Sequence, residues 1–154
     1  MYSVLLLLHS YNRWLVLISL VFTIFRSYQG WLRHKHFTKF DDRTRHITAT
    51  IVHIQLLLGL WLYAISPLVS FFLHHFEEAE KEREIRFFGM EHSSMMLVAV
   101  VLISIGSAKA KRKAADKEKF KTMAIWFSLG LLIILSSIPW QFSPLVSRPF
   151  LRSF

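Results

Sequence analysis

Four long runs of apolar residues, separated by charged segments, dominate this chain. The runs cover residues 3–25, 47–66, 90–108 and 123–140. Each is close to the length of about 20 residues that an α-helix needs to cross a hydrocarbon core of about 30 Å. The pattern therefore predicts four membrane-spanning helices.

The segments between the runs predict how these helices are arranged. The loops after the first and third runs are rich in Lys and Arg, whereas the loop after the second run, around residues 77–84, is rich in Glu. Basic loops of membrane proteins remain in the cytoplasm. We therefore expect an all-α, integral membrane four-helix bundle of up-down-up-down topology, with both termini and the acidic loop outside. The acidic segment contains neither Gly nor Pro, so we expect it to join the third span as one long helix.

Composition agrees with a small membrane protein. The chain has 154 residues, of which 53% are hydrophobic, and its mean hydropathy is +0.38. We expect one four-span domain over residues 1–154, embedded in membrane lipid. The chain has no cysteine, which excludes disulfides and thiolate metal sites.

The formal net charge of +9 does not by itself indicate a nucleic-acid partner. The basic residues collect in the two loops, where membrane topology explains them, and no aromatic-basic motif of a nucleic-acid-binding module is present. We therefore expect no nucleic acid among the partners of this protein.

Several polar residues interrupt the apolar runs, and such residues within a membrane span indicate a functional site. The first span contains His9 and Arg13, and the second contains His53. Glu91 and His92 begin the third. At about 1.5 Å of rise per residue, His9 and His92 lie at similar depth near the outer ends of their spans. By the same measure His53 lies roughly a dozen ångströms away, toward the cytoplasmic side.

Two histidines at one level on different helices are suited to ligate a haem iron from both sides. We therefore predict His9 and His92 as the metal ligands of a haem, with Arg13 beside a propionate. Glu91 and Gln55 are expected next to these groups. His53 is expected to serve a second centre, or a quinone or proton site. The absence of a C-x-x-C-H motif excludes covalent c-type attachment.

Other readings of the same residues stay open. Arg13 and Glu91 can form an ion pair that holds the first and third spans together, and a membrane histidine can simply bond to a neighbouring backbone. His9, Glu91 and His92 can also form a non-haem metal or quinone site. The chain as a whole can be a structural or accessory subunit without cofactor, part of a larger membrane complex or a homo-oligomer.

The order of short motifs along the chain resembles a known family. These motifs are His9-Ser10 with Arg13-Trp14, the stretch 53–59, Ile65-Ser66-Pro67, Glu91-His92 and Ile138-Pro139-Trp140. In this order they are similar to the short four-helix bacterial membrane proteins commonly labelled cytochrome b. The resemblance implies a b-type haem, an electron-transfer role in the bacterial inner membrane, and ligand status for His9, His53 and His92.

Overall fold

The computed structural model describes residues 1–140 and residue 146, and within these residues the chain is helical, without any strand. Four helices are long and apolar enough to cross a membrane, which confirms that part of the prediction. The membrane itself, and the side on which each loop lies, remain predictions. The four long helices are α1 (Tyr2–Leu32), α2 (Lys39–Ile65), α6 (His92–Arg112) and α7 (Asp116–Ser137).

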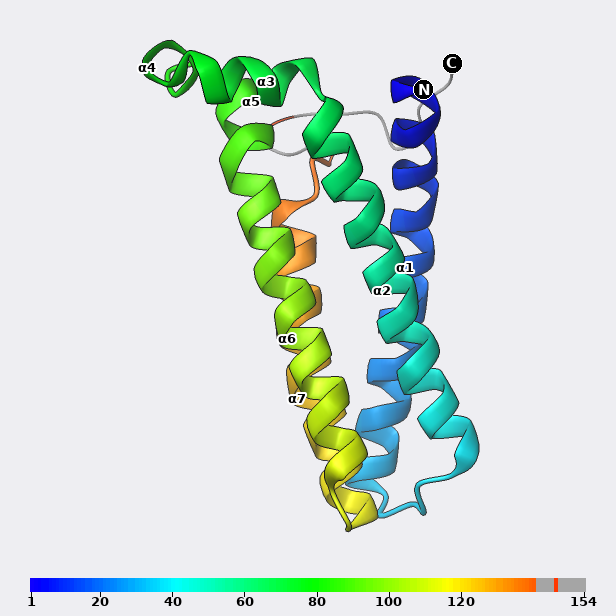
Figure 1. Ribbon diagram of the computed structural model, residues 1–154. Coiled ribbons are helices and arrows are strands. Elements are labelled where there is room, and N and C mark those ends of the chain that lie inside the picture. Colours follow the sequence, from blue (N-terminus) through cyan, green and yellow to red (C-terminus); the bar gives the residue numbers. More distant parts are fainter. Residues whose placement is uncertain (141–145, 147–154) are drawn as a thin grey trace.

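The four long helices alternate in direction along the chain (Figure 1). Helix α1 packs against α2 and α7, while α6 packs most extensively against α7 and less extensively against α2. Helices α1 and α6 are therefore diagonally opposite in the four-helix bundle. The start of α1 and the end of α7 lie at the same end, and the two short basic loops lie at the other. We call the latter end, with loops 33–38 and 113–115, the basic end.

The helices extend beyond the apolar runs that predicted them. Helix α2 begins at Lys39, well before the apolar run, because Thr38 and Asp41 form a reciprocal capping box at its start. The Thr38 hydroxyl accepts from the Asp41 backbone N–H, and the Asp41 carboxylate accepts from the Thr38 backbone N–H. Two backbone donors at the helix start are thereby satisfied.

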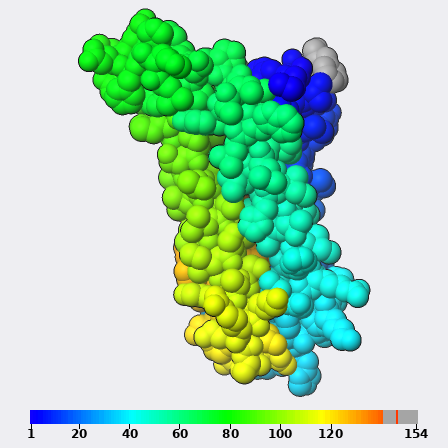
Figure 2. Space-filling view, viewed as in Figure 1, coloured from blue at the N-terminus to red at the C-terminus, as the bar shows by residue number. Residues whose placement is uncertain are grey.

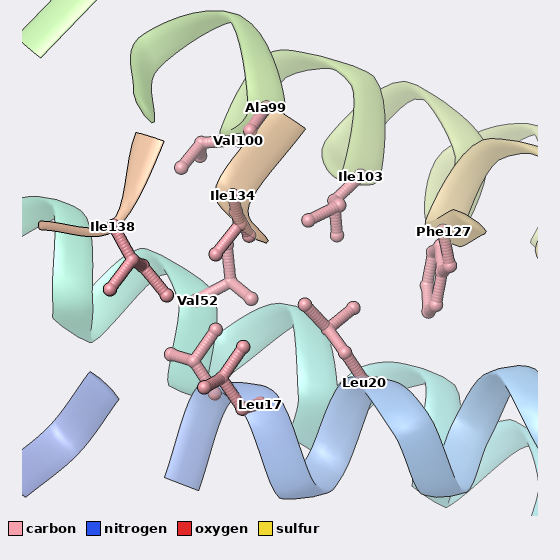
Figure 3. Close-up of a cluster of buried hydrophobic side chains, with 10 residues drawn as sticks. Leu17, Leu20, Val52, Ala99, Val100, Ile103, Phe127, Ile134 and Ile138 are labelled. Atoms are coloured by element: carbon pink, nitrogen blue, oxygen red, sulfur yellow. The ribbon is translucent and has the colours of Figure 1, made fainter. Parts of the chain in front are cut away.

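All four long helices contribute to a buried hydrophobic core (Figure 3). Leu20 on α1, Ile103 on α6 and Phe127 on α7 are fully buried, and Val52 on α2 is almost fully buried. Helices α6 and α7 approach closely because Gly130 has no side chain: a Cβ there would lie 2.5 Å from Cγ1 of Ile103. Small residues that allow such approaches are typical of packing between membrane helices.

Polar side chains join the helices in the half of the bundle nearer the basic end. The buried hydroxyls of Thr23 on α1 and Thr48 on α2 are 2.8 Å apart. Arg45 is 5% exposed, and its guanidinium donates to the Ser107 hydroxyl on α6 at 2.6 Å. These bonds satisfy polar groups that would be costly to bury alone.

Short helices lie at the opposite end of the bundle and project to one side of it (Figure 2). Helix α2 ends at Ile65, two residues before Pro67. This is expected, because proline has no backbone N–H and cannot continue a helix. The chain then turns across the bundle through four short elements. These are α3 (Pro67–His74), α4 (Phe76–Ala79), α5 (Arg83–Arg86) and the π-helix η1 (Phe87–Glu91).

The acidic segment does not join the third span as one helix. The prediction of one long helix is therefore wrong for the first half of this segment. Helix α4 ends at Ala79, and a continuous helical segment starts only at Arg83. In one uninterrupted helix Glu78 and Glu82 would lie one turn apart, and like charges at this spacing destabilise a helix. A turn at residues 80–82 replaces the helix there, directly after the fully buried Ala79.

Candidate cofactor site

His9 lies on α1 against α2, near the end of the bundle opposite the basic end. Its neighbour on α2 is Gly59, where a Cβ would lie 3.2 Å from Cε1 of the His9 ring. Any larger residue at position 59 would press on the imidazole. The Nδ1 atom of His9 is buried and forms no hydrogen bond with the described residues. A buried nitrogen without a partner is unusual, since such groups are nearly always paired.

His92 begins α6 directly after the π-helix η1. Its Nδ1 atom lies 2.8 Å from the backbone oxygen of Ser137, at the end of α7. A carbonyl only accepts, so Nδ1 carries the proton and Nε2 keeps a free lone pair. A backbone carbonyl on the second ring nitrogen is the usual arrangement for a histidine that ligates a metal.

The structure brings His9, His92 and Arg13 together. His9 and His92 come from the two helices on the diagonal, and they are close enough for their charges to interact. The Arg13 guanidinium acts on both rings and lies 5.5 Å from the centre of the Trp14 ring. Trp14 in turn packs edge-on against Trp140, with ring centres 6.3 Å apart. The Arg13 guanidinium therefore lies beside a pair of packed indoles.

Gln55 supports this site through the backbone of α1 rather than through the imidazole. Its side-chain amide donates to the His9 carbonyl at 3.0 Å and accepts from the Asn12 amide at 2.9 Å. The bonds fix the register between α1 and α2 beside His9, since a slip of either helix would break both.

Glu91 does not point into the cluster as a partner of Arg13. Its carboxylate accepts from Nε of Arg86 at 2.8 Å, and Arg86 also donates to the Glu80 carbonyl. Glu91 therefore anchors the short helices above the bundle. No group of three His, Asp or Glu side chains within the described residues is arranged to hold a metal ion. His9, Glu91 and His92 consequently do not form the three-residue metal site considered from the sequence.

His53 lies apart from the other two histidines, on an exposed face of α2. It precedes Gly59 by about 9 Å along the helix axis. Its Nε2 atom lies 2.8 Å from the Ser104 hydroxyl on α6, and that hydroxyl donates to the Val100 carbonyl at 2.7 Å. Ser104 must therefore accept from His53, which assigns the proton to Nε2 and leaves Nδ1 as an acceptor.

Sequence reasoning missed the contribution of Ser137, because a backbone carbonyl leaves no mark in the pattern of residue types. Pro139 carried a signal: proline has no N–H and ends the helix, so carbonyls of the last turn lack helical partners. The Leu135 carbonyl is satisfied by the Trp140 indole N–H at 2.9 Å. The Ser137 carbonyl is satisfied by His92.

Imidazole and guanidinium are the side-chain groups that bind a haem iron and its propionates. His92 has a free Nε2 oriented by a carbonyl, and the buried imidazole of His9 has an unused nitrogen at the same site. Arg13 supplies the cation that a propionate carboxylate requires.

Comparisons with family models, with curated proteins and with solved structures found no match to this chain.

Proposed function

We propose that this protein is a small membrane b-type cytochrome, which holds one haem between His9 and His92 and passes electrons to or from a quinone. The observation that carries the proposal is the buried Nδ1 atom of His9, which has no hydrogen-bond partner among the described residues. Each of the two imidazoles would bind the iron through one ring nitrogen. When bound, the haem supplies one reversible electron-transfer step.

The residues around the histidines have separate roles in this proposal. The Ser137 carbonyl fixes the tautomer and orientation of His92. Gly59 leaves room beside the His9 ring. Arg13 binds a propionate and places a positive charge near the iron, which favours the reduced state.

The proposed place of electron exchange with quinone is the pair of His53 and Ser104. The free Nδ1 of His53 is an acceptor on an exposed face of the bundle. In a bilayer that face meets lipid, where water is absent and an unpaired polar group is costly. A lipophilic hydroquinone provides the O–H donor that this atom lacks.

The orientation proposed for the chain follows from its charges. With the basic end in the cytoplasm, the cluster of His9, Arg13 and His92 lies near the outer face of the bacterial inner membrane. The proposed partner for electron exchange beyond quinone is a larger membrane complex or a second copy of the chain.

The test uses the purified full chain and three variants: His9→Ala, His92→Ala and Arg13→Gln. Reduced-minus-oxidised absorption spectra and haem content are measured for each. We expect a low-spin haem spectrum in the wild type, and loss of haem or a high-spin spectrum in either histidine variant. Arg13→Gln should keep its haem at a lower reduction potential, because a stabilising positive charge is removed.

The possible outcomes separate the competing readings. A wild-type protein without a Soret band contradicts the cofactor proposal and favours the cofactor-free accessory subunit. Full low-spin haem in His9→Ala or His92→Ala contradicts only this pair of ligands. Ser3→Ala, at an exposed position on the same helix as His9, is the matched control and should bind haem as the wild type does.

A further inference from the structure

A hollow lined by lysines lies at the basic end of the bundle. Its volume is about 310 Å³, room for roughly ten water molecules at about 30 Å³ each. Three cationic side chains from three different helices line it: Lys39 in the first turn of α2, Lys111 in the last turn of α6 and Lys119 in the first turn of α7. Phe37, Thr38 and Asp42 complete the lining.

The three lysines are not neutralised by carboxylates of the described residues. No ion pair among those residues involves Lys39, Lys111 or Lys119. The one acidic group in the lining, Asp42, is already engaged by Arg45 through Nε at 3.0 Å and a terminal nitrogen at 2.9 Å. The hollow consequently keeps an excess of positive charge.

An aromatic surface adjoins these cations. The Lys119 ammonium lies 5.0 Å from the centre of the Phe37 ring, and Phe37 itself packs against Phe120. The lining therefore presents an apolar ring beside charged heads. This combination matches an amphipathic anion better than a free inorganic one.

The level of the hollow in the bilayer also favours a lipid. Helix α2 has 27 residues, about 40 Å at 1.5 Å per residue. A bilayer measures about 40–45 Å with its headgroups included. In a bilayer that α2 spans from end to end, the first residue of α2, Lys39, and the last turn of α6 with Lys111 lie at the level of the lipid phosphates.

We infer that this hollow binds the phosphate group of an anionic phospholipid, held by Lys39, Lys111 and Lys119. The inference does not depend on the haem proposal. Basic pockets between the ends of membrane helices are suited to such headgroups.

The experiment compares two triple variants of the full chain in detergent. The site variant carries Lys39→Gln, Lys111→Gln and Lys119→Gln. The control carries Lys35→Gln, Lys113→Gln and Lys117→Gln, which remove the same charge at the same end from exposed positions outside the hollow. Binding of phosphatidylglycerol is titrated by native mass spectrometry, with phosphatidylcholine and inorganic phosphate as separate arms.

We expect the wild type and the control to retain phosphatidylglycerol in preference to phosphatidylcholine, and the site variant to bind it at least about tenfold more weakly. Equal loss in both triple variants would show general attraction to the basic end and overturn the inference. Inorganic phosphate that displaces the lipid at equal concentration would overturn the lipid as the ligand. If the site triple does not fold, the double variant Lys39→Gln with Lys111→Gln replaces it under the same criteria.

Discussion

At the scale of single residues, the three histidines of the candidate membrane spans differ in what surrounds them. His92 is held by a backbone carbonyl at 2.8 Å, and His9 has a buried nitrogen without a hydrogen-bond partner in the described chain. His53 is exposed and bonded to a serine hydroxyl. The same residue type therefore has three local environments, and only the first two share a site.

We predict that His53→Ala keeps the single low-spin haem signal of the wild type. Its ring is about 9 Å along the helix axis from the level of His9, so it is not placed to share an iron with both other histidines. The variant should instead slow the reduction or oxidation of the haem by an added quinone, measured by stopped-flow absorbance. Ser104→Ala keeps the imidazole and removes the serine hydroxyl, with its bonds to His53 and to the Val100 carbonyl, and serves as the comparison. Complete loss of haem in His53→Ala would make His53 a ligand and reject the proposed pair.

Candidate residues, though not their partners, could be predicted from the sequence. His9, Arg13 and His92 stand out because ionisable groups are rare within apolar runs. The partner of Glu91 was not predictable, since Arg86 lies five residues away and engages it only through the turns at η1. The role of Gly59 depends on where α1 packs against α2, which a pattern along one helix does not contain.

At the scale of elements, the π-helix η1 decides how α6 presents His92. A π-turn inserts one residue into a helix and disturbs its regular hydrogen bonds, and such turns are frequent at functional sites. Two contacts hold η1 in place. Tyr63 of α2 donates to the Gly89 carbonyl at 2.9 Å, and Phe72 of α3 packs directly over Gly89, where a Cβ would collide with its ring.

We predict that Tyr63→Phe destabilises this junction. The variant removes the hydrogen bond that the Tyr63 hydroxyl donates to the Gly89 carbonyl. The expected loss is about 1 kcal/mol of unfolding free energy, or about 2–4 °C in the midpoint of thermal unfolding for a chain of this size. Tyr11→Phe, at an exposed position of α1, should leave the midpoint unchanged. A midpoint for Tyr63→Phe equal to that of Tyr11→Phe would show that the bond contributes nothing.

The element boundaries show why the third span was only partly predicted. Helix propensity favours a helix through the acidic segment, whereas repulsion between Glu residues one turn apart opposes it. The structure has a break at residues 80–82. The four long helices were predictable because each combines apolar length with flanking charges, and the structure confirms them.

At the scale of the whole molecule, charge divides the bundle between its two ends. The segments 26–46 and 109–121 contain thirteen Lys and Arg against four Asp and Glu. The opposite end carries the Glu-rich segment with α4 and α5. This asymmetry is the basis of the proposed orientation, because short basic loops remain in the cytoplasm.

We predict that single cysteines at the two ends label from opposite sides of the membrane. The chain has no cysteine of its own, so Lys113→Cys and Glu80→Cys can each be introduced without a background signal. Both positions are exposed. A membrane-impermeant maleimide added to intact cells should label Glu80→Cys and leave Lys113→Cys unlabelled until the membrane is opened. Labelling of Lys113→Cys in intact cells would invert the orientation and move the cluster of His9, Arg13 and His92 to the cytoplasmic face.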